Sequence, residues 1–185
     1  KKKWLSILFY GVLAVFIFSP DAKSWVLRQI VSTGLLKAEI KKDGVNKNLP
    51  VAAAFTFSDS EGKAYTTANL KGKVVFINFW ASWCPPCRAE MPSLNKLYLK
   101  YRDDERFVFL FMNEDDDKAK AVRYIEDNHL AMPLYYSTDN VPNEIFSGTL
   151  PTTVVLDKNG KVVLKHNGMA DYNTDEFIRQ LKELL

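Results

Sequence analysis

The chain has 185 residues, of which 47% are hydrophobic and 13% aromatic, and its 25 Lys and Arg residues against 22 Asp and Glu residues leave a net charge of +3. This composition and length suffice for a globular domain with a sizeable core. The small positive charge comes largely from three leading lysines and does not predict a nucleic-acid partner. The two cysteines are close together in the sequence, so all cysteine chemistry is confined to one place.

The N-terminus combines a basic start with an apolar run. Lys1–Lys3 precede Trp4–Phe18, where only Ser6 and Gly11 relieve the run of apolar side chains. As a helix this run spans about 22 Å, short of the roughly 30 Å hydrocarbon core, so spanning would require flanking residues or local thinning. We predict residues 1–20 to be a membrane anchor or a signal segment.

A retained anchor is favoured over a cleaved signal peptide, because residues 18–22 lack the usual small-x-small cleavage site. A buried core helix is the third interpretation of the run. With an anchor or a signal the lysines stay on the cytoplasmic side, so the rest of the chain is expected across the membrane.

Residues 21–48 are predicted to form a juxtamembrane helix that closes with a polar linker. Apolar positions recur at helix-like spacing between Ser24 and Lys41, with Ser24 as the expected N-cap and Gly34 as an interruption. This helix either lies at the membrane interface, with Trp25 at headgroup depth, or packs on the domain that follows.

Residues 49–185 are predicted to form one α/β domain without internal repeats. Alternation of buried strands with helices implies parallel pairing in its centre. The predicted elements are, in chain order, a hairpin from Phe55–Phe57 through the turn at 59–63, a short turn at 67–70, strand 74–80, a helix from about Arg88 to Tyr101, strand 107–112, helix 118–129, strand 133–136, a short helix at 143–147, a hairpin of 153–156 with 162–166, and a helix capped by Thr174 and running to Leu185.

The two cysteines stand where strand 74–80 gives way to the following helix. Cys84 and Cys87 have two residues between them, and Cys84 falls at the expected helix start. Unpaired N–H groups there favour a thiolate and lower the thiol pKa, typically to roughly 3.5–7.5 in such motifs. Cys87, one turn on, is close enough to displace Cys84 from a mixed disulfide.

Two other roles for the cysteines are disfavoured. Zinc needs four ligands, and the remaining soft donors, His129 and His166, are too far apart in the sequence to complete a finger. A purely structural disulfide is disfavoured because a loop over two residues removes very little unfolded-chain entropy. Thiol–disulfide exchange is therefore the favoured chemistry.

Other candidate features carry less weight. Four adjacent acids at 114–117 cannot all converge on one ion, so no metal is predicted there, and Asp116 or Asp117 is expected to cap the next helix. The two histidines have no identifiable partners and are assigned surface or structural roles. Trp80 and Trp83 are expected to wall the active site.

The segment 79–87, Phe-Trp-Ala-Ser-Trp-Cys-Pro-Pro-Cys, resembles the active site of the thioredoxin superfamily. The preceding segment 72–78 is similar to the membrane-anchored TlpA/ResA branch, as are the Thr-Leu-Pro-Thr-Thr loop at 149–153 and the hairpin at 157–162. The resemblance covers roughly 49–185. It implies a thioredoxin fold: a central mixed sheet flanked by helices, here with an N-terminal hairpin extension and an N-terminal membrane-anchor helix.

Two positions refine this resemblance. Thioredoxin has a buried proton-accepting aspartate where this chain has Asn78, whose amide cannot take a proton. The TlpA/ResA branch instead implies Glu90, one turn beyond Cys87, as the catalytic proton acceptor. The alternative for Glu90 is an exposed acid paired with Arg88 or a later lysine. Pro85 replaces the glycine usual in thioredoxin, so no reduction potential is carried over.

The resemblance also implies a client-binding surface. The Leu150-Pro151 bond is expected to be cis and to lie against the cysteine motif, where the backbone of Leu150 pairs with an extended peptide. The alternative is an ordinary trans proline that opens the next strand. Trp83, Pro85 and Pro86, around the cysteines, complete the predicted substrate-binding set.

The sequence thus predicts a thiol–disulfide oxidoreductase whose only redox group is the Cys84–Cys87 disulfide, with no cofactor or metal. The resemblance suggests a reductase of periplasmic clients, for example in cytochrome c maturation, supplied with electrons by a membrane thiol donor. The expected location is the bacterial inner membrane facing the periplasm, or the soluble periplasm after signal cleavage. The alternatives are an oxidase or isomerase, or a non-catalytic binding module.

Overall fold

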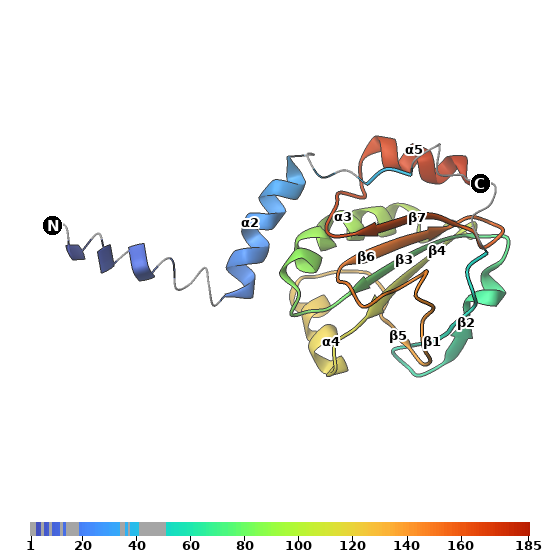
Figure 1. The fold of residues 1–185 in the computed structure, drawn as a ribbon, viewed down its shortest axis with the longest axis horizontal. Coiled ribbons are helices and arrows are strands. Elements are labelled where there is room, and N and C mark those ends of the chain that lie inside the picture. Colours follow the sequence, from blue (N-terminus) through green and yellow to red (C-terminus); the bar gives the residue numbers. More distant parts are fainter. Residues whose placement is uncertain are drawn as a thin grey trace.

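A seven-stranded mixed sheet with strand order β2-β1-β5-β4-β3-β6-β7 carries the fold (Figure 1). The computed structural model describes residues 3, 4, 6, 7, 9–11, 13, 19–33, 36, 38–40 and 51–185. Its elements are α2 (Pro20–Ser32), β1 (Thr56–Asp59), β2 (Ala64–Thr66), the 3-10 helix η2 (Thr67–Leu70), β3 (Val74–Trp80), α3 (Pro85–Tyr101), β4 (Phe107–Asn113), α4 (Lys118–Asp127), β5 (Tyr135–Ser137), β6 (Thr152–Leu156), β7 (Val162–Asn167) and α5 (Asp175–Glu183).

Strand β3 lies at the centre of the sheet, and all of its residues are buried. It pairs in parallel with β4 and antiparallel with β6. Its side chains alternate between two apolar clusters: Phe76 and Trp80 belong to one, and Ile77 and Phe79 to the other. Because both faces of the strand are covered, its sequence is an almost unbroken apolar run rather than an alternating one.

The larger cluster lies between the sheet and the helices. It takes Leu94 from α3, Tyr124 from α4 and Phe177 from α5, and the ring of Phe76 makes edge contacts with Tyr172 and Phe177. The smaller cluster contains Phe55, Phe57 and Ile145 and no residue of an α-helix. In the described part of the chain, α3, α4 and α5 therefore pack on one face of the sheet, while connecting segments and η2 cover the other.

Most of the predicted elements are confirmed, including the N-terminal hairpin β1–β2, the second hairpin β6–β7 and the cap of α5. The Thr174 hydroxyl accepts a hydrogen bond from the Phe177 N–H at 3.2 Å. The predicted helix at 143–147 is wrong. That segment makes a single turn, in which the N–H groups of Ile145 and Phe146 both donate to the Pro142 carbonyl. Gly148 follows with φ of 86°, which ends any helical path almost at once.

The helix of the juxtamembrane segment begins earlier than predicted. Ser19, not Ser24, is the N-cap of α2: its hydroxyl accepts from the Ala22 N–H at 3.2 Å. Pro20 sets the start, since proline is favoured in the first helical turn, where no N–H is needed. Ser24 lies inside the helix and donates its hydroxyl proton to the Pro20 carbonyl at 2.7 Å.

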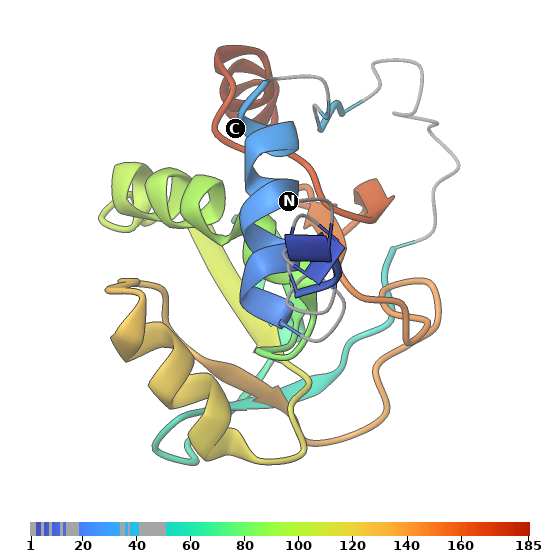
Figure 2. The same cartoon turned by 90° about the vertical axis from the view of Figure 1, so that its left-hand side faces the viewer.

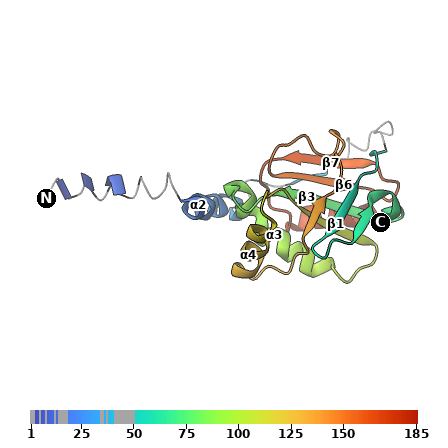
Figure 3. The same cartoon turned by 90° about the horizontal axis from the view of Figure 1, so that it is seen from below.

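Helix α2 packs against α3, the second of the two predicted arrangements. Ser24 and Val31 are buried on its inner side. Figures 1 and 3 show α2 beside the start of α3, and Figure 2 shows it lying across the front of the domain. This contact ties residues well before the predicted boundary at residue 49 to the sheet domain.

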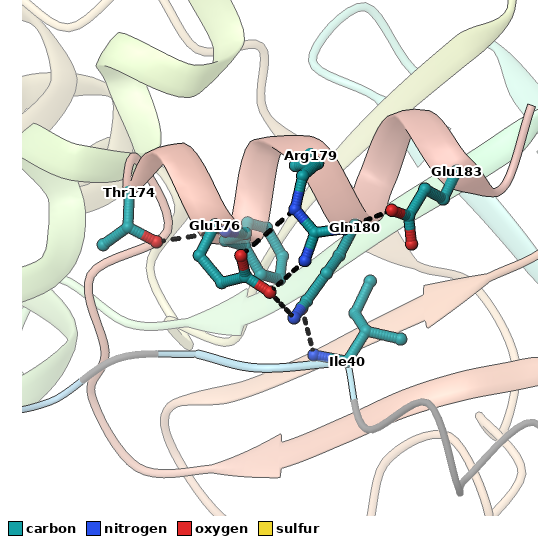
Figure 4. Close-up of polar contacts among 7 residues, drawn as sticks. Ile40, Thr174, Glu176, Arg179, Gln180 and Glu183 are labelled. Carbon is teal, nitrogen blue, oxygen red and sulfur yellow. Dashed lines mark hydrogen bonds and ion pairs between the residues drawn. The ribbon is translucent and has the colours of Figure 1, made fainter.

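A short segment after α2 is anchored to α5 (Figure 4). The Ile40 N–H donates to the Gln180 side-chain carbonyl at 2.6 Å, and the Gln180 amide donates to Glu176 at 2.6 Å. The Asp171 N–H donates to the Leu36 carbonyl at 2.8 Å. Because Ile40 and Gln180 are both buried, the Gln180 side-chain oxygen is an acceptor for the Ile40 N–H that water cannot replace.

The predicted anchor is described only in part. The described residues between 3 and 13 are helical, and they lie away from the domain (Figures 1 and 3). Within the described part of the chain, no helix combines the length and apolar character needed to cross a membrane. The rest of the predicted anchor, and the predicted linker at 41–48, lie outside the described residues.

Replacing Gln180 with leucine should destabilise the domain. Gln180→Leu keeps the apolar stem but leaves the buried Ile40 N–H without its acceptor, a cost of about 1–3 kcal/mol in the free energy of unfolding. Arg179→Leu is the control, because it removes only solvent-exposed ion pairs to Glu176 and Glu183, which contribute little to stability. Urea unfolding of the oxidised protein measures both, and an equal loss for the two variants would contradict the anchoring role.

Candidate active site

The site is built at the junction of β3 and α3. Helix α3 begins at Pro85, three residues earlier than predicted, because Cys84 is its N-cap. Pro85 and Pro86 fill the first helical positions, where a missing N–H costs nothing. The Cys84 sulfur accepts a hydrogen bond from the Cys87 N–H at 3.3 Å. The sulfur atom therefore takes the place of the hydroxyl or carboxylate that usually caps a helix.

Cys84 and Cys87 are joined in a disulfide, with their Cα atoms 5.3 Å apart. Cys84 is 4% exposed and Cys87 is fully buried, so attack from outside reaches Cys84 first. When the bond is reduced, the helix N-terminus and the Cys87 N–H both favour negative charge on the Cys84 sulfur. The geometry thus gives the two cysteines unequal accessibility.

The predicted surface residues around the cysteines differ in exposure. Trp83 is 59% exposed beside the disulfide, and Pro85 and Pro86 are partly exposed. Trp80 is completely buried in the apolar cluster that contains both cysteines, with its ring 5.6 Å from that of Tyr124. Trp83 is therefore the tryptophan that an incoming client can touch, while Trp80 supports the site from below.

Glu90 is fully buried beneath the disulfide, one turn along α3 from Cys87. One carboxyl oxygen accepts from the Asn78 side-chain amide at 2.8 Å, and the other accepts from the Ala170 N–H at 3.2 Å. The Asn78 amide also donates to the Thr153 hydroxyl at 2.9 Å. The alternative prediction of an exposed acid paired with Arg88 is wrong, because Glu90 faces the sheet.

Burial controls the protonation of Glu90. Removal from water disfavours the carboxylate and raises the pKa of Glu90 to about 8, although the hydrogen bonds from Asn78 and Ala170 act in the opposite direction. At neutral pH the folded, oxidised protein therefore holds this carboxyl mostly protonated. A buried group with a pKa near that of an ordinary thiol, about 8.5, is well matched to exchange protons with one.

The Leu150-Pro151 peptide bond is cis, as the family resemblance implied. The pairing of Thr152 with Phe79 brings this loop to the end of β3 from which the cysteine motif departs. The Gly168 N–H donates to the Pro151 carbonyl at 2.8 Å, which fixes the loop from its far side. Leu150 is partly exposed and packs against the cluster that contains the cysteines.

A carboxylate that the sequence analysis did not assign to the site holds the loop before Cys84. The N–H and the hydroxyl of Ser82 donate to Asp115 at 3.0 and 2.9 Å, and the Asn113 amide donates to it at 2.7 Å. Asp115 was grouped with its acidic neighbours, of which Asp117 caps α4 as expected. Asp115 follows shortly after β4, which runs parallel to β3. The ends of the two strands therefore lie side by side, and this was the available signal for a contact between Asp115 and the loop before Cys84.

No metal site accompanies these groups in the described part of the chain, where no three His, Cys, Asp or Glu residues could hold an ion. His129 is exposed at a positive φ of 52°, and His166 lies in β7. Neither histidine lies in the helix turn or the loops that build the disulfide site.

A buried disulfide whose first cysteine caps a helix, in a fold that also has a cis-proline loop, defines the class of the protein: it is a thiol–disulfide oxidoreductase with a thioredoxin-like fold. The Redoxin family matches residues 43–179, most of the chain, and the chain belongs to that family. Within the thioredoxin superfamily it is a TlpA/ResA-like member, as its relatives show.

Two curated relatives carry the name thiol-disulfide oxidoreductase ResA. The protein from Bacillus anthracis is 34% identical over 158 residues, 84% of this chain and 85% of the relative. The protein from Geobacillus thermodenitrificans is 39% identical over 112 residues, 60% of this chain, and this match spans 64% of the relative. Among solved structures, StoA from Bacillus subtilis aligns with a TM-score of 0.56 and 26% identity, covering 73% of this chain and 98% of that one.

The buried Glu90 carboxyl should make stability depend on pH. Its folded-state pKa of about 8 lies above the ordinary value of 4.5, so the folded state binds the extra proton. The stabilisation is complete below about pH 4.5 and is lost as the pH rises through 8. We expect Glu90→Gln to remove this decline, since the amide stays neutral.

Urea unfolding of oxidised wild type and variants between pH 5 and pH 9 measures the difference. Glu105→Gln, at an exposed position, is the control and should keep the wild-type slope. Parallel pH profiles for wild type and Glu90→Gln would contradict a buried, protonated carboxyl.

Proposed function

We propose that this chain is a disulfide reductase of the bacterial envelope. The observation that carries the proposal is the Cys84–Cys87 disulfide at the N-terminus of α3, where Cys84 is the more accessible of the two, 4% against 0% exposed. A helix start that favours a thiolate on the more accessible sulfur is suited to attack on a second disulfide.

The exchange runs in two balanced steps. The Cys84 thiolate attacks one sulfur of the client disulfide, forming a Cys84–client bond and releasing the other client sulfur as a thiolate. The Cys87 thiolate then attacks Cys84, closes the Cys84–Cys87 disulfide and releases the second client sulfur. Two electrons pass from the dithiol to the client, which is the oxidant. The released thiolates take up protons from solvent.

The carboxylate form of Glu90 accepts the proton that Cys87 must lose before the second step, and Glu90 becomes the neutral acid. The structure contains the disulfide, the state that follows this loss, and in that state the pKa of Glu90 is about 8, so the carboxyl retains the proton at neutral pH. Its hydrogen bonds to Asn78 and Ala170 hold it in place one turn beyond the buried sulfur. The proton thus stays in the protein until the next reduction.

The client lies as an extended segment against the cis-proline loop. The backbone of Leu150 pairs with the client on one side of Cys84, and Trp83, Pro85 and Pro86 form the apolar surface on the other. Support for this placement is that Leu150 and Trp83 both remain solvent-accessible around a nearly buried Cys84. The main-chain contact makes the interaction tolerant of client sequence.

The donor is a second thiol–disulfide protein in the membrane, because the sequence has no glycine-rich dinucleotide fingerprint. The basic start and apolar run at 1–18 attach the chain to the inner membrane with the redox domain on the outer, periplasmic side. Apoproteins of c-type cytochromes are the leading client class, as the resemblance of the sequence motifs to the TlpA/ResA branch implies.

Cys87→Ser should trap clients. Without the resolving thiolate, the Cys84–client bond persists, so mixed disulfides should accumulate in cells. Cys84→Ser is the matched control and should not accumulate the same set. Partners are purified under non-reducing conditions and identified by mass spectrometry. Equally empty profiles for both variants would contradict catalytic exchange and favour a binding module.

A further inference from the structure

Helix α2 is tied directly to the redox site. The Arg88 guanidinium, on the residue next to Cys87, pairs with Asp21 in the first turn of α2. The same guanidinium lies 5.1 Å from the ring centroid of Tyr124, and its side chain is only 13% exposed. The chain therefore enters the folded body beside the disulfide rather than at the opposite end of the domain.

The outer side of α2 exposes three large apolar side chains beside the exposed, polar Gln29. Ser24 and Val31 face inward and are buried, whereas Trp25, Val26 and Ile30 are 63%, 36% and 40% exposed. A helix that packs through one side normally carries polar groups on the other, and an exposed tryptophan with two branched apolar residues departs from that pattern. We call these three residues the outer face of α2.

The orientation of α2 is fixed at both of its ends. Asp21 holds the first turn to α3. The hydrogen bond from the Asp171 N–H to Leu36 holds the following segment to the connection before α5, and that from the Ile40 N–H to Gln180 holds it to α5 itself. The outer face therefore has a set direction relative to the disulfide. Anything that covers this face also determines what Cys84 faces.

The sequence just before α2 indicates that a lipid surface covers the outer face of this helix. The apolar run Trp4–Phe18 ends directly before Ser19, the cap of α2. Its described residues lie beyond that end of the helix (Figures 1 and 3). A helix that follows a membrane-inserted run begins at headgroup depth, where tryptophan is favoured.

We propose that the outer face of α2 rests on the bilayer, so that the Cys84–Cys87 pair is held at the membrane surface and reacts preferentially with thiols and disulfides presented there. This inference rests on the membrane attachment in the proposed function. It adds that α2 holds the redox domain in a fixed orientation on the membrane. It also adds that the redox site favours partners that lie at the membrane surface.

The test uses the full chain, reduced and reconstituted in vesicles of phosphatidylcholine and phosphatidylglycerol. The rate of reduction is measured for one aromatic disulfide, either linked to a lipid headgroup or free in solution. We expect the wild type to favour the lipid-linked form by roughly tenfold, because both partners share one surface and their effective concentration rises. Trp25→Glu should lose most of this preference with an unchanged rate on the soluble disulfide.

Leu99→Glu is the control, since Leu99 is 45% exposed on α3 and outside the outer face. It should keep the wild-type preference. A second measurement is quenching of tryptophan fluorescence by brominated lipid, in which Trp25→Phe should lose part of the wild-type quenching. Equal preference in wild type and Trp25→Glu, or equal quenching in wild type and Trp25→Phe, would overturn the inference.

Failure of the underlying function gives different results. If the wild type did not reduce the soluble disulfide, the proposed reductase activity would be ruled out. If the protein stayed in the dense fraction while the vesicles floated, the proposed membrane attachment would be ruled out. A wild-type dimer that Trp25→Glu converts to a monomer, with no change in lipid preference, would assign the outer face to a second copy and overturn the membrane contact.

Discussion

The hydrogen bond between the Asn78 amide and the Glu90 carboxyl joins the central strand to the helix that carries the cysteines. The same amide reaches Thr153 on β6, so three elements meet at one buried polar point beneath the disulfide. An aspartate at position 78 would place two carboxyls in contact there, and one pKa would rise steeply. Asparagine instead donates to Glu90 and leaves a single buried acid to handle protons.

That arrangement explains why the acid can be buried at all. A buried polar group is costly unless it is hydrogen-bonded, and Glu90 has a partner on each oxygen. Desolvation still outweighs these contacts and keeps the pKa of Glu90 near 8. In the oxidised protein the result is a carboxyl that is mostly neutral at neutral pH, one turn along α3 from Cys87.

Much of the fold follows from local patterns in the sequence. The run 74–80 could only be a strand covered on both faces, and cysteine and proline at 84–86 have the backbone preferences of a helix start. The turn at 143–147 was missed because apolar Ile145 and Phe146 suggest a helix, whereas their burial against β3 needs only one turn. Ring stacking of Phe146 on Phe79 at 4.2 Å is a tertiary contact with no local signal.

The site was predictable where the chemistry lies within one helical turn, and less so where it depends on distant segments. Cys84, Cys87 and Glu90 lie at the cap and in the first turns of α3, so helix geometry places them close together, while the role of Glu90 was implied by the family resemblance. Asp115 reaches Ser82 only because β4 runs parallel to β3 and ends beside it. The contact of α2 with α3 depends equally on tertiary packing, since apolar spacing alone fitted both a membrane interface and a protein surface.

The central claim is that Cys84 and Cys87 form a reversible two-electron couple at the head of α3. Equilibration of the protein with graded mixtures of reduced and oxidised glutathione, followed by acid quenching and mass spectrometry of alkylated thiols, measures this directly. We expect one sigmoidal transition in which both cysteines change together. The same curve should be obtained from the reduced and from the oxidised protein. A tenfold change in the equilibrium constant corresponds to roughly 30 mV in reduction potential. A pair that stays oxidised across the whole range, or cysteines that react independently with glutathione, would contradict it.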